Sequence, residues 1–189
     1  MTNGGGGVPD AVNDVAAGAV LVVLRGNSAS GKSTTATTLQ HSMERSTCVV
    51  VPQDVVRRKM TWEPDEAGRI NVELIEHIAT FALARGLVTI VEGILDTRRY
   101  GAMLERLANA APRSLFYAFD LSFEETLLRH ASRPLAAEVP ESFLAQWYHG
   151  WQPLEFTTET RIDASWDLTT ITERIRGDIA AARTDGPGR

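Results

Sequence analysis

Eight residues near the start of the chain, 26–33, have the types and spacing of a nucleotide-binding loop. They read Gly-Asn-Ser-Ala-Ser-Gly-Lys-Ser and fit the pattern G-x-x-x-x-G-K-[ST] at every fixed position. Glycines let backbone N–H groups surround a phosphate, the lysine reaches the β- and γ-phosphates, and the serine hydroxyl binds Mg²⁺. The chain holds only two lysines, Lys32 and Lys59, so a lysine at this position is not expected by chance.

This motif predicts a site for ATP and Mg²⁺ at the positive end of the helix that follows it. The next residue, Thr34, is expected either beside the α-phosphate or on the surface of that helix. The predicted nucleotide-binding residues are Gly26, Asn27, Ser28, Ala29, Ser30, Gly31, Lys32, Ser33 and Thr34.

Two carboxylates follow apolar segments that are typical of buried strands. Asp54 comes shortly after the run 47–51, and Glu92 comes directly after the run 87–91. Asp54 would accept the proton of an attacking hydroxyl or orient it, and would hold Mg²⁺ through water, unless it only caps a helix. Glu92 would bind Mg²⁺ through water or contact the acceptor, because an isolated buried carboxylate is costly. The predicted metal ligands are therefore Ser33, Asp54 and Glu92.

Arginines at three places could bind the transferred phosphoryl group or the acceptor. Arg57 lies one helical turn after Asp54 and would contact an anionic group. Arg98 follows the segment of Glu92, and would contact the acceptor or lie on the surface at the start of a helix. Arg129 and Arg133 are four residues apart, so one helical face can carry both as a clamp on the phosphoryl group, the alternative being an exposed pair.

The segment 130–150 is predicted to be a small helical lid that closes over the site and excludes water. Pro134 and Pro140 bracket part of it, and two aromatic residues, Trp147 and Tyr148, stand near its end. We expect Tyr148 to contact the acceptor and Trp147 to pack the lid against the core.

The elements that must position these residues alternate along the chain. Apolar runs predict strands at 19–24, 47–51, 87–91, 114–121 and 160–162. Patterns between them predict helices at 31–44, 66–85, 98–109, 123–130, 140–149 and 168–182. In helix 66–85 the buried face is predicted from Ile70, Leu74, Ile78 and Phe81, with Gly86 as the cap. This alternation predicts a three-layer α/β/α fold with a mostly parallel sheet and ligands at the carboxyl ends of its strands.

The length of 189 residues favours one domain, expected at 19–183, with disordered tails at 1–18 and 184–189. The formal net charge of −5 disfavours nucleic acid as a partner. The single cysteine, Cys48, excludes an internal disulfide framework. With neither a long apolar run nor a secretory leader, the chain is expected to be cytoplasmic and without a membrane partner.

In the order of these features the chain resembles the P-loop kinases that phosphorylate hydroxyls of small molecules or nucleic acids. This group includes chloramphenicol phosphotransferase, adenylylsulfate kinase, zeta toxins, the kinase domain of phage polynucleotide kinase, and short bacterial P-loop kinase-like ATP-binding proteins. The polynucleotide kinase parallel rests on Asp54 with Arg57, and on Glu92 followed by Arg98 and Arg99. The resemblance implies a P-loop NTPase fold with Asp54 as base, Arg57 as a transition-state or acceptor contact, and Lys32 with the lid arginines on the phosphates.

The expected function is ATP- and Mg²⁺-dependent transfer of the γ-phosphoryl group to a hydroxyl of a small molecule, such as a nucleoside, sugar or antibiotic. Two alternatives stay open: a polynucleotide 5′-hydroxyl kinase, and a regulatory protein that binds ATP without phosphorylating an acceptor. The sequence lacks an N-K-x-D motif, which disfavours a GTPase, and is short for an AAA-type ATPase with a helical lid domain. It decides neither the acceptor nor the oligomeric state.

Overall fold

A computed structural model describes residues 18–131, 145 and 147–184 of the chain. The strands are β1 (Val20–Gly26), β2 (Cys48–Pro52), β3 (Val88–Gly93), β4 (Ser114–Phe119) and β5 (Thr160–Ile162). The helices are α1 (Lys32–His41), α2 (Gln53–Val55), the π-helical turn η1 (Val56–Met60), α3 (Ile70–Leu83), α4 (Thr97–Ala110), α5 (Phe123–Ala131) and α7 (Leu168–Thr184). In the described part of the chain, no helix combines the length and apolar character that a membrane crossing requires.

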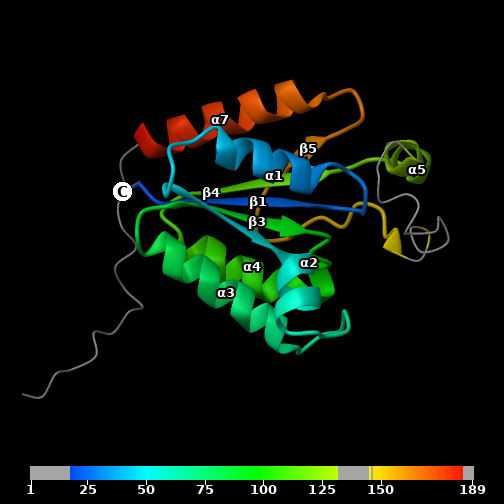
Figure 1. The fold of residues 1–189 in the computed structure, drawn as a ribbon, viewed down its shortest axis with the longest axis horizontal. Coiled ribbons are helices and arrows are strands. Elements are labelled where there is room, and N and C mark those ends of the chain that lie inside the picture. Colours follow the sequence, from blue (N-terminus) through cyan, green and yellow to red (C-terminus); the bar gives the residue numbers. More distant parts are fainter. Residues whose placement is uncertain (1–17, 132–144, 146, 185–189) are drawn as a thin grey trace, which may run out of the picture.

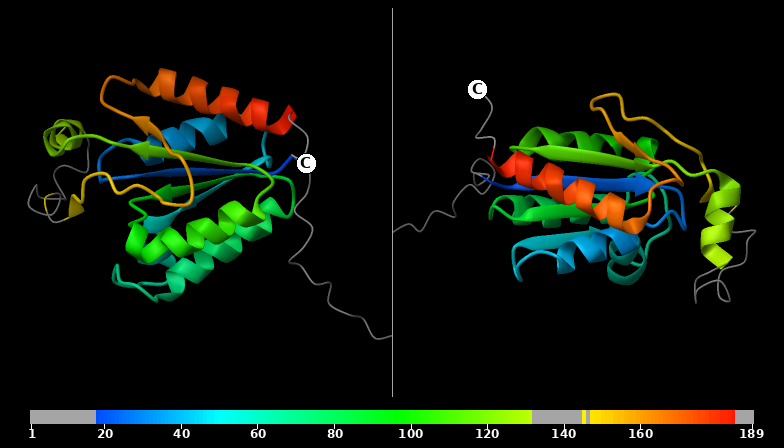
Figure 2. Two further views of the ribbon diagram at one scale, coloured as in Figure 1. Left: turned by 180° about the vertical axis from the view of Figure 1, so that it is seen from behind. Right: turned by 90° about the horizontal axis from the view of Figure 1, so that it is seen from above.

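The strands form one parallel sheet in the order β2-β3-β1-β4-β5. Helices α1 and α7 cover one face of this sheet, and α3 and α4 cover the other (Figure 1). Two further views show the same three layers, with α5 beyond the end of β4 (Figure 2). The prediction of a three-layer α/β/α fold is confirmed, and every described strand pairing is parallel.

Strand β1 is central because its side chains are apolar on both sides. Leu21 and Val23 pack in the core under α3 and α4, whereas Val20, Val22 and Leu24 pack in the core under α1 and α7. This alternation is the period of two that a strand imposes on its side chains. A strand covered on both faces has the unbroken apolar run that the sequence shows.

The buried face of α3 differs from the predicted one by one position. The fully buried residues of its apolar stripe are Ile75, Ala79, Ala82 and Leu83. Of the predicted residues, Leu74 and Ile78 are partly buried and pack against the core, whereas Ile70 and Phe81 are exposed. The polar residue Asn71 begins the buried stripe, because its side chain donates to Glu63 and accepts from Tyr100. Hydrophobicity alone missed this face, since a satisfied buried amide has no apolar signature. Gly86 does end the helix region, with a φ of 74°.

Several predictions fall on residues 1–17, 132–144, 146 and 185–189, which lie outside the described part of the chain. They are the tails, most of the lid, the greater part of the helix 140–149, and Arg133. These stay predictions.

Candidate functional site

The loop between β1 and α1 has the backbone that its sequence predicts. Its left-handed residues are Gly26 (φ 143°), Ala29 (φ 62°) and Gly31 (φ 107°). A Cβ atom on Gly26 would lie 2.4 Å from the carbonyl oxygen of Phe119, so this position accepts glycine alone. Gly31 is the N-cap of α1, which places the first N–H groups of the helix at the loop.

Lys32 is buried within this loop. Its Nζ donates to the carbonyl oxygen of Asn27 at 2.6 Å and to Oγ of Ser30 at 3.0 Å. Asn27 in turn accepts from the backbone N–H of His149 and donates to the carbonyl oxygen of Gly150. The Lys32 ammonium group therefore lies beside the backbone that would surround a phosphate. Asn27 connects the loop by hydrogen bonds to the segment that follows residue 147.

Ser33 and Glu92 meet beside the loop. Ser33 Oγ donates to Glu92 Oε2 at 3.1 Å, and Glu92 lies at the end of β3, in register with Leu24 and Pro52 of the neighbouring strands. Burial raises the pKa of Glu92 above its usual range, an effect that the Lys32 ammonium and the Ser33 hydrogen bond oppose and the charge of Asp54 reinforces. A hydroxyl and carboxylates are the hard oxygen ligands that suit Mg²⁺.

Asp54 lies on α2, directly after β2, and binds two guanidinium groups through one oxygen. Arg57 Nη2 lies 3.0 Å and Arg58 Nε 3.3 Å from Asp54 Oδ1. The other oxygen, Oδ2, has no hydrogen-bond partner among the described residues. Half of the Asp54 side chain is exposed, so a hydroxyl can reach that oxygen.

Arg57 and Arg58 lie on η1, a π-helical turn of the kind that often marks functional sites. Arg57 is nine-tenths buried and also donates to the carbonyl oxygen of Glu63, while its Nε has no hydrogen-bond partner in the described part of the chain. Arg57 and Asp54, which lie one helical turn apart in the sequence, therefore contact each other, and the predicted contact of Arg57 with the acceptor or the phosphoryl group stays a prediction.

A cavity of about 510 Å³ opens beside this pair. Its described lining residues come from separate segments and are Arg57, Arg58, Asp65, Ile94, Arg99, Trp147 and His149. Arg99 pairs with Asp65 at 3.0 Å, and the guanidinium of Arg58 lies 5.3 Å from the ring centre of Trp147. This volume is within the range of small-molecule sites.

Two predicted acceptor contacts lie elsewhere. Tyr148 donates to the carbonyl oxygen of Leu121 and packs edge-on against Phe123, whereas Trp147 lines the cavity. The side chain of Arg98 is 79% exposed and pairs with Asp96, while its neighbour Arg99 turns into the cavity. Successive residues on a helix point about 100° apart, so the sequence could not decide which arginine faces the site.

Arg129 on α5 reaches the nucleotide loop from the start of the predicted lid. Its Nη1 donates to the carbonyl oxygen of Ser30 at 2.8 Å. A second cavity, of about 280 Å³, lies on this side of the loop. Its lining residues are Ser30, Gly31, Thr34, Thr35, Phe119, Arg129, Trp166, Asp167, Leu168 and Ile171.

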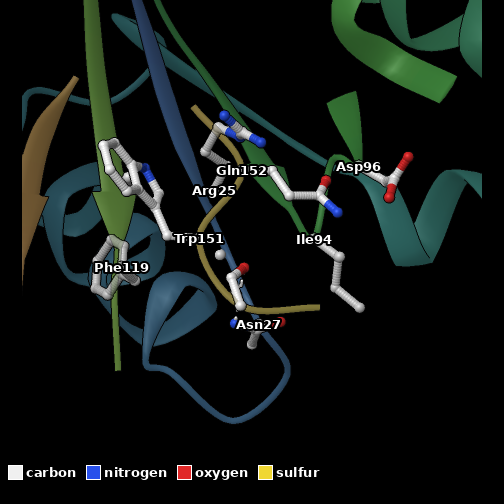
Figure 3. Close-up of a pocket in the computed structure, with 10 residues that line it drawn as sticks. Arg25, Asn27, Ile94, Asp96, Phe119, Trp151 and Gln152 are labelled. Atoms are coloured by element: carbon white, nitrogen blue, oxygen red, sulfur yellow. Dashed lines mark hydrogen bonds between the residues drawn. The ribbon is translucent and has the colours of Figure 1, made fainter. Parts of the chain in front are cut away.

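A third cavity, at the end of β1, holds only about 20 Å³ and is lined by Arg25, Asn27, Asp96, Trp151 and Gln152, among others (Figure 3). That is room for about one water molecule and not for an acceptor. Arg25 instead forms a buried ion pair with Glu159 at 3.0 Å and donates to Thr97 Oγ1. This pair joins β1, α4 and the segment before β5, and the charged Arg25 in an apolar strand was its only signal in the sequence.

A buried hydrogen-bond network holds Gln53, the residue that directly precedes Asp54. Gln53 Nε2 donates to the hydroxyl of Tyr100 at 2.8 Å, and that hydroxyl also contacts Asn71 and Asp65. Burial, together with the charge of Asp65, raises the pKa of Tyr100 to about 12, so it stays protonated. A Cβ atom on Gly93 would lie 2.6 Å from Cβ of Gln53, so this glycine admits the close approach.

Comparison with known proteins places the chain in a family. A family model described as an AAA domain matches residues 21–154, which is most of the chain, and the protein belongs to this family. The described residues after the match add β5 and α7 and not a separate helical domain. No curated protein matches the chain in sequence.

Solved kinase structures share the fold. The APS kinase of Mycobacterium tuberculosis, in complex with AMPPNP and APS, aligns with a TM-score of 0.66 at 16% identity, covering 86% of this chain and 98% of that one. A gluconokinase from Sinorhizobium meliloti aligns with a TM-score of 0.60 at 18% identity, covering 87% of this chain and 93% of the gluconokinase chain. A sugar kinase from Janibacter sp. aligns with a TM-score of 0.59 at 18% identity, covering 88% of this chain and 97% of the sugar kinase chain. These structures confirm the fold that the resemblance to P-loop kinases implies.

Proposed function

We propose that the protein transfers the γ-phosphoryl group of ATP, with Mg²⁺, to a hydroxyl group of a small molecule. One observation carries the proposal: Glu92 interacts with Lys32, Ser33 and Asp54 at the carboxyl edge of the sheet. Asp54 in turn contacts Arg57 and Arg58, which line a cavity large enough for an acceptor. The shared fold with kinases supports the same reaction class.

ATP would bind along the loop and into the 280 Å³ cavity. The N–H groups of the loop and Lys32 would bind the β- and γ-phosphates, and Thr34 would lie near the α-phosphate. The adenine ring of ATP would occupy the part of this cavity beside Phe119 and Trp166, and Arg129 would lie next to it. Bound with Mg²⁺, which Ser33 and the carboxylates would hold directly or through water, ATP supplies the activated phosphoryl group.

On the opposite side of the γ-phosphate, Asp54 would receive the acceptor. Its Oδ2 accepts the hydrogen bond of the hydroxyl, while Arg57 and Arg58 hold Oδ1 and fix the direction of the carboxylate. The hydroxyl oxygen forms a bond to the γ-phosphorus, and the bond from that phosphorus to the bridging oxygen breaks. The hydroxyl proton passes to Asp54, and ADP leaves with the bridging electron pair. In such a loose transition state, orientation by Asp54 matters more than basicity.

A screen with γ-labelled ATP over sugars, hydroxy acids, nucleosides and antibiotics tests the proposal. We expect Lys32→Ala to abolish tight binding of Mg·ATP, and Asp54→Asn to keep ATP binding but lower transfer by about 100-fold or more. Glu105→Gln, an exposed carboxylate on α4, is the matched control and should leave both unchanged. Full transfer by Asp54→Asn would show that Asp54 does not handle the hydroxyl. A protein that binds ATP but labels no acceptor would favour the regulatory alternative.

A further inference from the structure

The charge of the 510 Å³ cavity carries information about the acceptor. Three guanidinium groups line it, those of Arg57, Arg58 and Arg99, against one carboxylate, that of Asp65. Asp54 lies outside the lining and shares a single oxygen between Arg57 and Arg58. The described lining therefore has an excess of positive charge in a protein whose net charge is −5.

Each of the three arginines keeps hydrogen-bonding capacity that the protein does not use. A guanidinium has five N–H donors. Arg58 makes its hydrogen bond through Nε, and Arg99 makes its bonds to Asp65 through Nη1, so among the described residues both Nη groups of Arg58 and Nη2 of Arg99 are available. Paired guanidinium nitrogens match the two oxygens of a carboxylate or phosphate.

The first turn of α4 adds a second, independent observation. Basic residues are unfavourable at the positive end of a helix, yet Arg98 and Arg99 both lie in the first turn of this 14-residue helix, and that turn contains no acidic residue. Asp96 at the N-cap and Asp65 offset part of this charge. Arg98 faces the solvent, whereas Arg99 brings its charge to the cavity, where a bound anion would offset the cost of a cation at this end of the helix.

From this geometry we infer that the acceptor is a small hydroxylated anion, with a carboxylate or phosphate group bound by Arg58 and Arg99. The inference rests on the proposed function and names its substrate class. The anionic group would lie between η1 and the start of α4, and the hydroxyl would point to Asp54. Ile94 and the ring of Trp147 provide apolar walls for the carbon skeleton.

Matched pairs of compounds that differ only in the anionic group test the inference. Suitable pairs are gluconate with sorbitol, 3-phenyllactate with 3-phenylpropane-1,2-diol, and glycerol 3-phosphate with glycerol. Each compound is titrated calorimetrically into the full chain saturated with AMPPNP and Mg²⁺, so that the nucleotide loop is occupied. The same pairs are then compared by ADP release in the presence of ATP.

We expect the anionic member of at least one pair to bind about 10- to 100-fold more tightly than its neutral partner. Arg58→Gln and Arg99→Gln should each reduce that preference by about 10-fold. Arg106→Gln removes an exposed arginine of α4 that pairs with Glu76 away from the cavity, and should leave the preference unchanged. Because the side chain of Arg58 is half exposed, its variant keeps the test valid even where Arg99→Gln fails to fold.

Equal binding of both members, binding of no anionic member, or a preference that survives both cavity variants would overturn the inference. Labelling of 5′-hydroxyl oligonucleotides without labelling of any small anion would overturn it in favour of a nucleic-acid acceptor. Failure of AMPPNP to bind would contradict the proposed function, whereas normal AMPPNP binding without the charge preference would contradict the acceptor class alone.

Discussion

The proposed nucleotide side of this site comes mainly from one loop, residues 26–33, whereas the proposed acceptor cavity takes residues from η1, the loop before α3, α4 and the segment after residue 146. The loop depends on backbone angles that glycine permits, at Gly26 and Gly31. The cavity depends on ion pairs between segments distant in sequence, such as Arg99 with Asp65.

This difference has a consequence for how each side can change. A loop that binds phosphate through its backbone tolerates few substitutions, because each fixed position has a steric reason. A cavity built from side-chain pairs can exchange those side chains while the sheet behind it stays the same. We therefore expect substitutions in the nucleotide loop to act mainly by straining its backbone. Substitutions in the cavity should act mainly by changing its charge.

Breaking the buried ion pair of Arg25 with Glu159 should have the largest effect on stability. Glu159→Gln leaves the nine-tenths-buried Arg25 without a charged partner, and we expect a loss of about 3–5 kcal/mol in the free energy of unfolding, measured with urea. The exposed pair of Arg106 with Glu76 provides the control, since Glu76→Gln should cost no more than about 1 kcal/mol. Similar losses in the two variants would contradict the role given to the Arg25 pair.

Gly26→Ala tests the nucleotide side in the same way. The added Cβ atom would clash with the carbonyl oxygen of Phe119, and the φ of 143° at residue 26 is unfavourable for alanine. We therefore expect a loss of about 2–4 kcal/mol in the free energy of unfolding, together with weakened ATP binding. Gly177→Ala, in the middle of α7 with open space around it, should instead stabilise the protein by about 0.5–1 kcal/mol. Urea unfolding and nucleotide titration measure both effects. Unchanged ATP affinity in Gly26→Ala would show that the loop is less constrained than its geometry indicates.

Tyr100→Phe tests the network that positions Asp54. Removing the hydroxyl leaves the amide of Gln53 without its acceptor, and we expect a loss of about 1–3 kcal/mol. ATP affinity should stay the same while the KM for the acceptor rises, because Gln53 directly precedes Asp54, the residue proposed to bind the acceptor hydroxyl. Equal weakening of ATP affinity and of acceptor binding, seen as the rise in KM, would show that Tyr100 has only a general structural role.

Glu92→Gln should have the smallest effect on stability, with the opposite sign. Because burial raises the pKa of Glu92, the folded protein binds this proton more tightly than the unfolded chain does. Stability from this group is therefore present at low pH and is lost as the pH rises through its folded pKa. At neutral pH the ligand-free Gln variant should melt at or above the temperature of the wild type, and the advantage should vanish below pH 4.5. Thermal melts over pH 4–8 measure it, and a lower melting temperature at neutral pH would contradict the unfavourable burial of this charge.

Much of the fold could be predicted because the strong signals are local. The apolar run before the nucleotide loop is a strand covered on both faces, and the loop itself has a steric reason at each glycine. The one-turn spacing of Asp54 and Arg57 was also visible in the sequence, whereas the ion pair between them was seen only in the structure. The buried face of α3 was predicted only in part: Leu74 and Ile78 pack against the core, but the burial of Asn71 depends on partners supplied by Glu63 and Tyr100.

The sequence by itself determined the nucleotide-binding loop, the α/β class and the acidic residues at the strand ends, because each depends on neighbours in the chain. Tertiary structure alone decided that Arg99 faces the cavity and Arg98 the solvent, that Trp147 and not Tyr148 lines it, and that Arg25 meets Glu159. Those outcomes depend on how helices and loops pack across the end of the sheet. A side chain's direction there is fixed by partners that are far away in sequence and close only after folding.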